Sequence, residues 1–231
     1  MSKHLGNAVN PFDQIEKYGA DAVRFYMMTN SEPWDNLKYD EKGVDEVRRK
    51  FFGTLYNTYS FFSGYANVDA FDTEAAQVPV AERPEIDRWV LSVLNTLIKG
   101  VQKEMENFDP TRAGRLIEDF VNNDLSNWYV RLNRKRFWGK EMSQDKLAAY
   151  QTLYTCLTTV AKLLAPFAPF FADQLFCDLG AAQLEGTTSV HLAKFPVVDE
   201  QLIDRELEER MGMAQKITSM VHALRKKVNI A

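Results

Sequence analysis

The sequence predicts a mainly α protein: an antiparallel bundle of four or five long helices, preceded by a small α/β region. Three observations support this class. Apolar residues recur at three- and four-residue steps over most of the chain, as they do on the buried face of a helix. Capping residues followed by proline mark helix starts. The connections between the periodic segments are short, which favours antiparallel neighbours.

The N-terminal part predicts short elements. Residues 1–9 have no apolar period and are expected to form a loop, after which Asn10 and Pro11 supply a cap and a first helical residue. This helix should end at Gly19. A second helix is expected over residues 20–29, followed by a candidate strand over residues 36–40. The inward positions of the second helix are expected to be Val23 and Met27, with Tyr26 as a further candidate.

The remaining chain predicts long helices. The apolar pattern predicts them over residues 44–66, 86–105, 109–138, 143–164 and 207–228, with a break near residues 123–124 as an alternative. Residues 67–83 lose the pattern and should form an exposed connection. Pro166 and Pro169 force a kink or a new helix start, and residues 188–195 should be extended. The apolar positions Trp89, Phe167 and Phe170 are expected in the core.

Composition limits the possible functions. The 231 residues are 45% hydrophobic and 26% charged, as in an ordinary water-soluble domain, and the net charge is −4. Residues 199–210 hold six acids and two bases, which accounts for that imbalance, so the rest of the chain can carry a local basic face. No apolar stretch is long enough to cross a bilayer, so we expect a cytoplasmic protein without a membrane partner.

The cysteines and histidines predict no metal site. Cys156 and Cys177 lie in apolar helical patterns and are expected to be small core residues in a reducing compartment. The three histidines are scattered, and no Glu-x-x-His pair is present. A metal-carrying helical bundle is therefore excluded as a function.

The segment from Leu125 to Lys140 carries the strongest functional signal. It holds five bases and no acid. At about 100° per residue, Asn127, Arg131, Arg134 and Trp138 fall within about 60° of one another, with Lys135 beside them. The opposite face, which should pack into the bundle, carries Leu125, Tyr129 and Leu132.

Such a stripe suits a flexible RNA loop. Arginine and lysine neutralise phosphates, an asparagine amide can read a base edge, and an indole offers a stacking surface. The competing interpretation is a solvated basic face whose tryptophan is covered by a neighbouring helix. This segment alone does not decide between the two.

Two further sets of residues carry a family resemblance. Met1-Ser2-Lys3-His4-Leu5-Gly6-Asn7, followed by Lys17-Tyr18-Gly19-Ala20-Asp21-Ala22-Val23-Arg24, resembles the KMSKS region of class I aminoacyl-tRNA synthetases. The stretch from Asn127 to Trp138 resembles the anticodon-domain helix of the isoleucyl and valyl branch, as do Asp87-Arg88-Trp89 and Leu164 to Phe170. Ser189-Val190-His191-Leu192 and Arg225 to Ile230 favour the isoleucyl family.

The resemblance departs from the motif at two places and implies a chemistry. The lysine that should precede Met1 is absent, which suggests that the chain was cut inside the motif, and His4 stands where many members have serine. Members of the family activate an amino acid with ATP and Mg²⁺ and then acylate tRNA. By resemblance, Lys3 would stabilise charge on the ATP phosphates and Ser2 would assist, in the parent enzyme only.

The resemblance also implies an organisation. Residues 1–44 would form the KMSKS-like loop and stem-contact region, 45–187 the anticodon-binding bundle, and 188–231 an extended segment, a helix and the start of a further region. We expect the catalytic and editing domains, and any cofactor, to be missing from this chain. The expected partners are an isoleucine tRNA and the parent enzyme's other domains, with the protein a monomer. The candidate tRNA contacts are Asn127, Trp128, Arg131, Arg134, Lys135 and Trp138.

Two alternatives stay open. The chain could be the same portion of a valyl- or leucyl-tRNA synthetase. It could also be a helical scaffold that binds another protein through the acidic residues 199–210 and the last helix. The scaffold hypothesis predicts no salt-sensitive RNA binding and leaves the basic-aromatic stripe without a purpose.

Overall fold

The first helix begins where its cap predicts. In the computed structural model, which describes residues 9–228, α1 (Pro11–Tyr18) is capped by Asn10, whose side-chain oxygen accepts a hydrogen bond from the amide of Phe12 at 3.1 Å. Gly19, with φ of 88°, then turns the chain into α2 (Ala20–Asn30). That φ lies in the left-handed region, which a residue with a Cβ disfavours.

The buried face of α2 differs in part from the prediction. Val23 is buried as predicted, but Met27 is 49% exposed, so that prediction was wrong. The buried face includes Phe25, which stacks on Phe51, and Tyr26, which packs edge-on against Tyr39, together with Thr29. Met27 lies away from it.

The predicted strand over residues 36–40 does not form. This segment is irregular, and the hydroxyl of Tyr26 uses its backbone groups: it donates to the carbonyl of Lys38 at 3.3 Å and accepts from the amide of Asp40 at 2.9 Å. Because residues 9–228 contain no strand to pair with it, no ladder can form. The described part of the predicted α/β region is therefore helical and irregular.

A continuous helical segment follows, made of α3 (Glu41–Glu46), η2 (Val47–Phe52) and α4 (Gly53–Val68). The middle section is a π-helix, in which the amide of Gly53 donates to the carbonyl of Arg48, five residues earlier. The prediction of a helix here is confirmed. Its predicted apolar face is buried at Val44, Phe51, Leu55 and Phe62.

The connection over residues 69–84 is less exposed than predicted. The side chain of Arg83 is buried and donates to the carbonyl of Val78 at 3.0 Å and to the hydroxyl of Thr152 at 2.9 Å. The amide of Val78 donates to the side-chain oxygen of Gln151 at 2.9 Å. These bonds fix the loop against the bundle, so the prediction of an exposed connection was wrong at these residues.

Two of the central helices begin at side-chain caps, of which the Asp109–Pro110 cap was predicted. The carboxylate of Asp109 accepts from the backbone of α6 (Pro110–Asp119), which packs against α5 (Glu85–Glu106). Ser143 caps α8 (Gln144–Leu164) in the same way. These starts are local and were predicted correctly.

The proline-rich turn after α8 starts a new helix, as predicted. α9 (Pro169–Asp178) has its proline in the first turn and is followed by α10 (Ala181–Leu184). Residues 188–195 do not form a continuous extended segment, because a 3-10 turn interrupts them. Three-residue turns of this type are η3 (Val80–Glu82), η5 (Val190–Leu192) and η6 (Glu200–Leu202).

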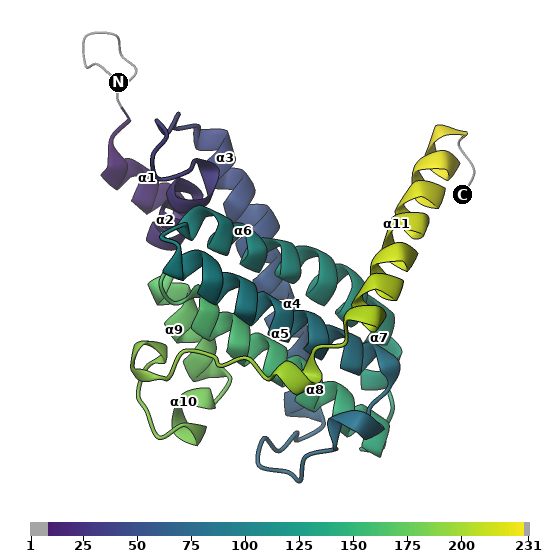
Figure 1. Ribbon diagram of the computed structural model, residues 1–231. Coiled ribbons are helices and arrows are strands. Elements are labelled where there is room, and N and C mark those ends of the chain that lie inside the picture. Colours follow the sequence, from purple (N-terminus) through teal and green to yellow (C-terminus); the bar gives the residue numbers. More distant parts are fainter. Residues whose placement is uncertain (1–8, 229–231) are drawn as a thin grey trace.

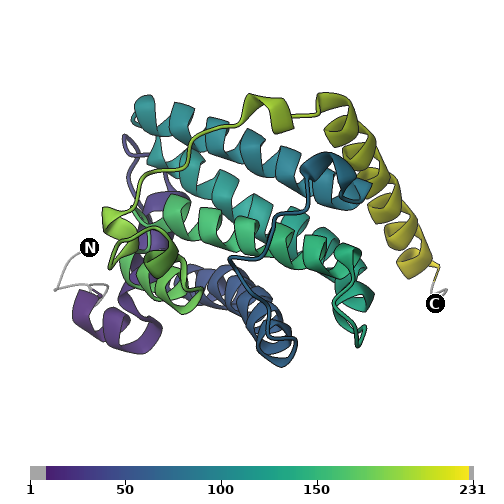
Figure 2. The ribbon, with the colours of Figure 1, turned by 90° about the horizontal axis from the view of Figure 1, so that it is seen from below.

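The last helix, α11 (Arg205–Lys227), leaves the bundle rather than joining it. Figures 1 and 2 both place α1 and α2 at one end of the molecule and α11 at the other, where it projects outward. Leu207 is buried and Met211 is half-buried, but the later apolar residues are exposed. The prediction of a long helix here is confirmed, and most of its apolar positions face solvent.

The core fills with aromatic and aliphatic side chains from most of the helices. Trp89 and Phe167 are buried as predicted, and Cys156 is a buried core residue, whereas Cys177 is half-buried. Phe170 is 70% exposed, so its predicted core position was wrong. It lies in the first turn of α9 and lines a surface hollow instead. No helix among the described residues could span a membrane.

Candidate nucleic-acid interface

The basic-aromatic segment lies on a helix with a π-helical part. η4 (Phe120–Val130) runs directly into α7 (Arg131–Phe137), and the amide of Arg131 donates to the carbonyl of Ser126, five residues earlier. The wider turn changes which side chains face inward. As a result Leu132 is 56% exposed, and its predicted place in the core was wrong.

The other inward positions of this segment are as predicted. Leu125 and Tyr129 are fully buried. The hydroxyl of Tyr129 donates to a carboxylate oxygen of Asp87 at 2.8 Å, because a buried phenol needs a polar partner. Burial, together with the negative charge of Asp87, raises the pKa of Tyr129 well above its usual value.

The predicted contact residues are placed mostly on the surface. Trp138 is 57% exposed, which confirms that it lies on the charged side rather than in the core, and Trp128 is half-buried against the core. Among the described residues, the charged groups of this set have no hydrogen-bond or ion-pair partner. The exposed members are Asn127, Arg131, Arg134, Lys135 and Trp138; we call these five residues the basic-aromatic surface.

One base of the same segment has a structural role. Arg136 forms two bonds with the fully buried carboxylate of Asp87, at 2.6 and 2.9 Å, and another with Asp145 at 2.8 Å. Burial alone would lower the pKa of the Arg136 guanidinium, but the bonds to these carboxylates raise it above its ordinary value. Arg136 therefore fastens α7 to α5 and α8 and is not available to a ligand.

A second buried cation fixes the turn after Trp138. The ammonium of Lys146, 2% exposed, donates to the carbonyl of Gly139 at 2.6 Å and pairs with Asp69 at 2.6 Å. The C-terminal end of the basic-aromatic surface is thus held by the bundle. Preorganised side chains lose less entropy when a ligand binds.

The start of the surface lies beside α11. The side-chain amide of Gln215 donates to Asp124 at 3.1 Å across the junction. Burial raises the pKa of Asp124 to about 6, and the carboxylates of Asp119 and Glu208 add to the shift, while the bond from Gln215 opposes it.

Past this junction a groove opens. Its volume is about 280 Å³, and four of its lining residues come from η4 and α7: Asn127, Trp128, Arg131 and Leu132. The other three come from α11: Thr218, Ser219 and His222. These three residues were not predicted, because the sequence of α11 was read only for its apolar period.

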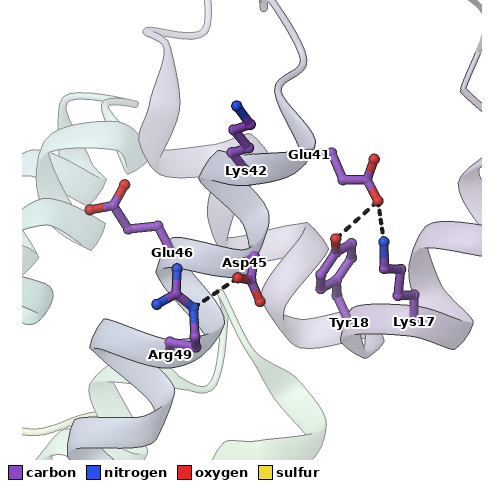
Figure 3. Close-up of a pocket in the computed structure, with 7 residues that line it drawn as sticks. All are labelled: Lys17, Tyr18, Glu41, Lys42, Asp45, Glu46 and Arg49. Atoms are coloured by element: carbon purple, nitrogen blue, oxygen red, sulfur yellow. Dashed lines mark hydrogen bonds and ion pairs between the residues drawn. The ribbon is translucent and has the colours of Figure 1, made fainter.

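A second charged hollow lies at the opposite end of the molecule, between α1 and α3. It holds about 350 Å³ and is lined mainly by charged side chains. Figure 3 shows how part of this charge is paired: Lys17 and Tyr18 both bond to Glu41, at 2.6 and 2.9 Å, and Arg49 bonds to Asp45 at 2.8 Å, whereas Lys42 and Glu46 make no bond to the other residues drawn. The bond from Lys17 lowers the pKa of Glu41. This hollow neutralises its own charge.

No group of side chains within residues 9–228 is arranged to hold a metal ion. The predicted phosphate contacts Ser2 and Lys3 lie outside the described residues. The candidate interface therefore consists of the basic-aromatic surface and the groove beside it, which together offer cations, amides, hydroxyls and indole rings.

Comparison with known proteins identifies the class of such a helical bundle. Residues 87–231 match the family described as the anticodon-binding domain of tRNA ligase, and residues 1–40 match class I tRNA synthetases (I, L, M and V). The chain belongs to the anticodon-binding domain family of tRNA ligases.

Individual relatives are more specific. The chain is 68% identical over its whole length to the isoleucine–tRNA ligase of Bacteroides thetaiotaomicron and 61% identical to that of Porphyromonas gingivalis. It is 49% identical over 98% of its length to the isoleucine–tRNA ligase of Dehalococcoides mccartyi. The chain spans only 20 to 22% of the length of these relatives.

A solved structure has the same fold. It is the ternary complex of LeuRS, tRNA and LeuAMS from Agrobacterium radiobacter K84, which superimposes with a TM-score of 0.64 at 22% identity. The match covers 88% of this chain and 23% of that one. At this identity the likeness supports the fold alone.

Proposed function

We propose that this chain is the portion of an isoleucine–tRNA ligase that binds the anticodon stem and loop of an isoleucine tRNA. The parent enzyme would activate isoleucine with ATP, release pyrophosphate and transfer the amino acid to tRNA. The observation that carries the proposal is the basic-aromatic surface, whose cations have no partner within the described residues. The relatives that are 68 and 61% identical to this chain are isoleucine–tRNA ligases.

The roles of the surface residues follow from their chemistry. Arg131, Arg134 and Lys135 bind phosphates of the loop, because exposed cations without an internal partner lose little when they bind an anion. Asn127 bonds to a base edge, and Trp138 stacks on an unpaired base. Trp128, which is half-buried, contributes only its exposed edge.

The parent enzyme supplies what this chain lacks. We propose that Lys3 contacts the ATP phosphates there and that Ser2 assists, with Mg²⁺ as the counter-ion. Residues 1–44 serve as the loop and stem-contact region, 45–187 as the anticodon-binding bundle and 188–231 as the start of a further region. We expect the protein to be cytoplasmic and monomeric and the isolated chain to be inactive in aminoacylation.

The experiment is a titration of the chain with an isoleucine tRNA and with a non-cognate tRNA, each at two salt concentrations. The test variant is Arg131→Ala/Trp138→Ala. The matched control, Lys103→Ala/Phe108→Ala, also removes one exposed cation and one exposed aromatic ring, but at the C-terminal end of α5, which lies outside both the basic-aromatic surface and residues 1–44.

We expect salt-sensitive binding that favours the isoleucine tRNA, is lost in the test variant and is kept in the control. If the test variant lost equal affinity for both RNAs, the surface would bind phosphates without distinguishing between the two tRNAs. If a folded wild-type chain bound neither RNA at low salt, the proposal would be wrong and a protein-binding scaffold would be the better hypothesis.

A further inference from the structure

The groove between α7 and α11 has the lining of a site for a planar polar group. Its two apolar contributors, Trp128 and Leu132, come from the η4–α7 helix. On the other side lie two hydroxyls and an imidazole that can form hydrogen bonds, from Thr218, Ser219 and His222. Its volume of about 280 Å³ is close to the ~300 Å³ at which small-molecule pockets begin.

The polar groups of the groove are not used by the fold. Thr155 and Thr158 on α8 donate to carbonyls four residues earlier in their own helix, at 2.8 and 2.9 Å. Thr218 makes no such bond, and neither Ser219 nor His222 has a side-chain partner in the part of the chain that the structure describes. These groups are therefore free to bond to a ligand.

The first turns of α11 hold this wall of the groove in place. Glu208 accepts hydrogen bonds from Ser92 at 2.6 Å and Thr96 at 2.7 Å, both on α5, and Leu207 is buried. Gln215, two turns further along, donates to Asp124 of η4. Thr218, one turn further along, begins the groove, and α11 then diverges from the bundle (Figures 1 and 2). The groove is thus open to solvent but has a fixed base.

We propose that this groove receives one unstacked base of the bound RNA. This proposal rests on the proposed function. Trp128 and Leu132 contact the face of the base, while Ser219 and His222 bond to its edge. Arg131, which lines the groove and also belongs to the basic-aromatic surface, binds the adjoining phosphate. The chemistry favours a base over a phosphate here, because α11 supplies no lysine or arginine to the lining.

The distance between the groove and Trp138 fits a short stretch of loop. Seven residues separate Arg131 from Trp138, which is roughly 10 Å along a helix. The two sites are therefore close enough for the nucleotides of one loop to reach both.

The test is a double-mutant cycle between the groove and the RNA. The anticodon stem-loop of an isoleucine tRNA is prepared with a single abasic nucleotide at each loop position in turn. The wild-type chain is compared with Ser219→Ala/His222→Ala. The control, Met213→Ala/Met220→Ala, removes exposed side chains of α11 that do not line the groove.

We expect one abasic position to weaken wild-type binding about five- to 150-fold, as the loss of a stacked base does. The groove variant should bind the intact loop more weakly than wild type does. The abasic nucleotide at that same position should then reduce its affinity only slightly further, while the control variant should behave as wild type. Additive losses at every position, with RNA still bound, would overturn the groove site and leave the proposed function standing. No binding of the intact loop by the wild-type chain would overturn both.

Discussion

Two charged regions lie at opposite ends of this molecule and differ in whether their charged side chains form ion pairs within the protein. In the hollow between α1 and α3, Lys17 pairs with Glu41 and Arg49 pairs with Asp45. On the basic-aromatic surface, Arg131 and its neighbours have no acidic partner within the described residues. The hollow has a larger volume than the groove beside α11, but the unpaired surface has the net charge that attracts an RNA.

The comparison also separates two kinds of arginine within one helix. Arg136 is bound to the buried Asp87, whereas Arg131 faces solvent. The first should therefore control stability and the second RNA binding. Substitutions in the two regions can test that separation, and their expected effects range from several kcal/mol to a slight change in RNA binding.

Arg136→Ala should lower the free energy of unfolding by about 3–5 kcal/mol, because it leaves the carboxylate of Asp87 buried without its cation. Chemical denaturation measures the loss. Arg131→Ala is the matched control and should change stability by no more than about 0.5 kcal/mol. Equal effects of the two substitutions would contradict the proposed division of roles.

Trp138→Ala should weaken binding of the anticodon stem-loop about five- to 150-fold without changing stability, because the exposed indole stacks on a base. Trp138→Phe keeps an aromatic face and should retain most of the affinity. Fluorescence anisotropy of a labelled stem-loop measures both. If the phenylalanine variant bound as weakly as the alanine variant, stacking would not be the role of this residue.

Asp124→Asn should remove a pH dependence of stability. The pKa of Asp124 is raised to about 6 in the folded protein, so the folded state binds more protons than the unfolded state between about pH 4 and 6. Its contribution to the free energy of unfolding therefore falls as pH rises through that window and is constant above it.

This contribution is obtained as the difference between wild type and Asp124→Asn, since Glu41 and Asp45, with lowered pKa values, have the opposite pH dependence. Urea unfolding at several pH values gives that difference, which we expect to favour the asparagine variant above pH 6. A difference that does not change with pH would contradict the raised pKa.

Glu41→Gln should have the smallest effect. It releases Lys17 from its ion pair and so makes the hollow slightly basic. We expect weak, salt-sensitive and non-selective RNA binding to increase a little at low salt. Measurement with a non-cognate tRNA tests this. A gain in selectivity for the isoleucine tRNA would contradict the view that unpaired charge alone gives no specificity.

Local sequence signals predicted the helix starts well. Asn10, Asp109 and Ser143 each cap a helix with their own side chain, so neighbouring residues decide the outcome. The exposure of Trp138 was also predicted, because the spacing of the basic residues places it on their side of the helix.

Features that depend on packing were not predicted. The π-helical turn of η4 places Leu132 on the surface. A prediction that assumes regular α-helical spacing cannot include this change of side-chain direction. The strand over residues 36–40 failed because it has no pairing partner among the described residues. The groove residues on α11 were missed because an apolar period predicts a buried face, whereas this helix projects from the bundle.

The most direct test is the salt dependence of tRNA binding for single-charge variants from the two regions. Arg131→Ala, Arg134→Ala and Lys135→Ala should each reduce the slope of log K against log salt by about 1, since each removes one phosphate contact. Lys17→Ala should leave the slope unchanged, because its charge is already paired with Glu41. Equal slopes for all four variants, or a reduction confined to Lys17→Ala, would contradict the assignment of the basic-aromatic surface as the tRNA interface.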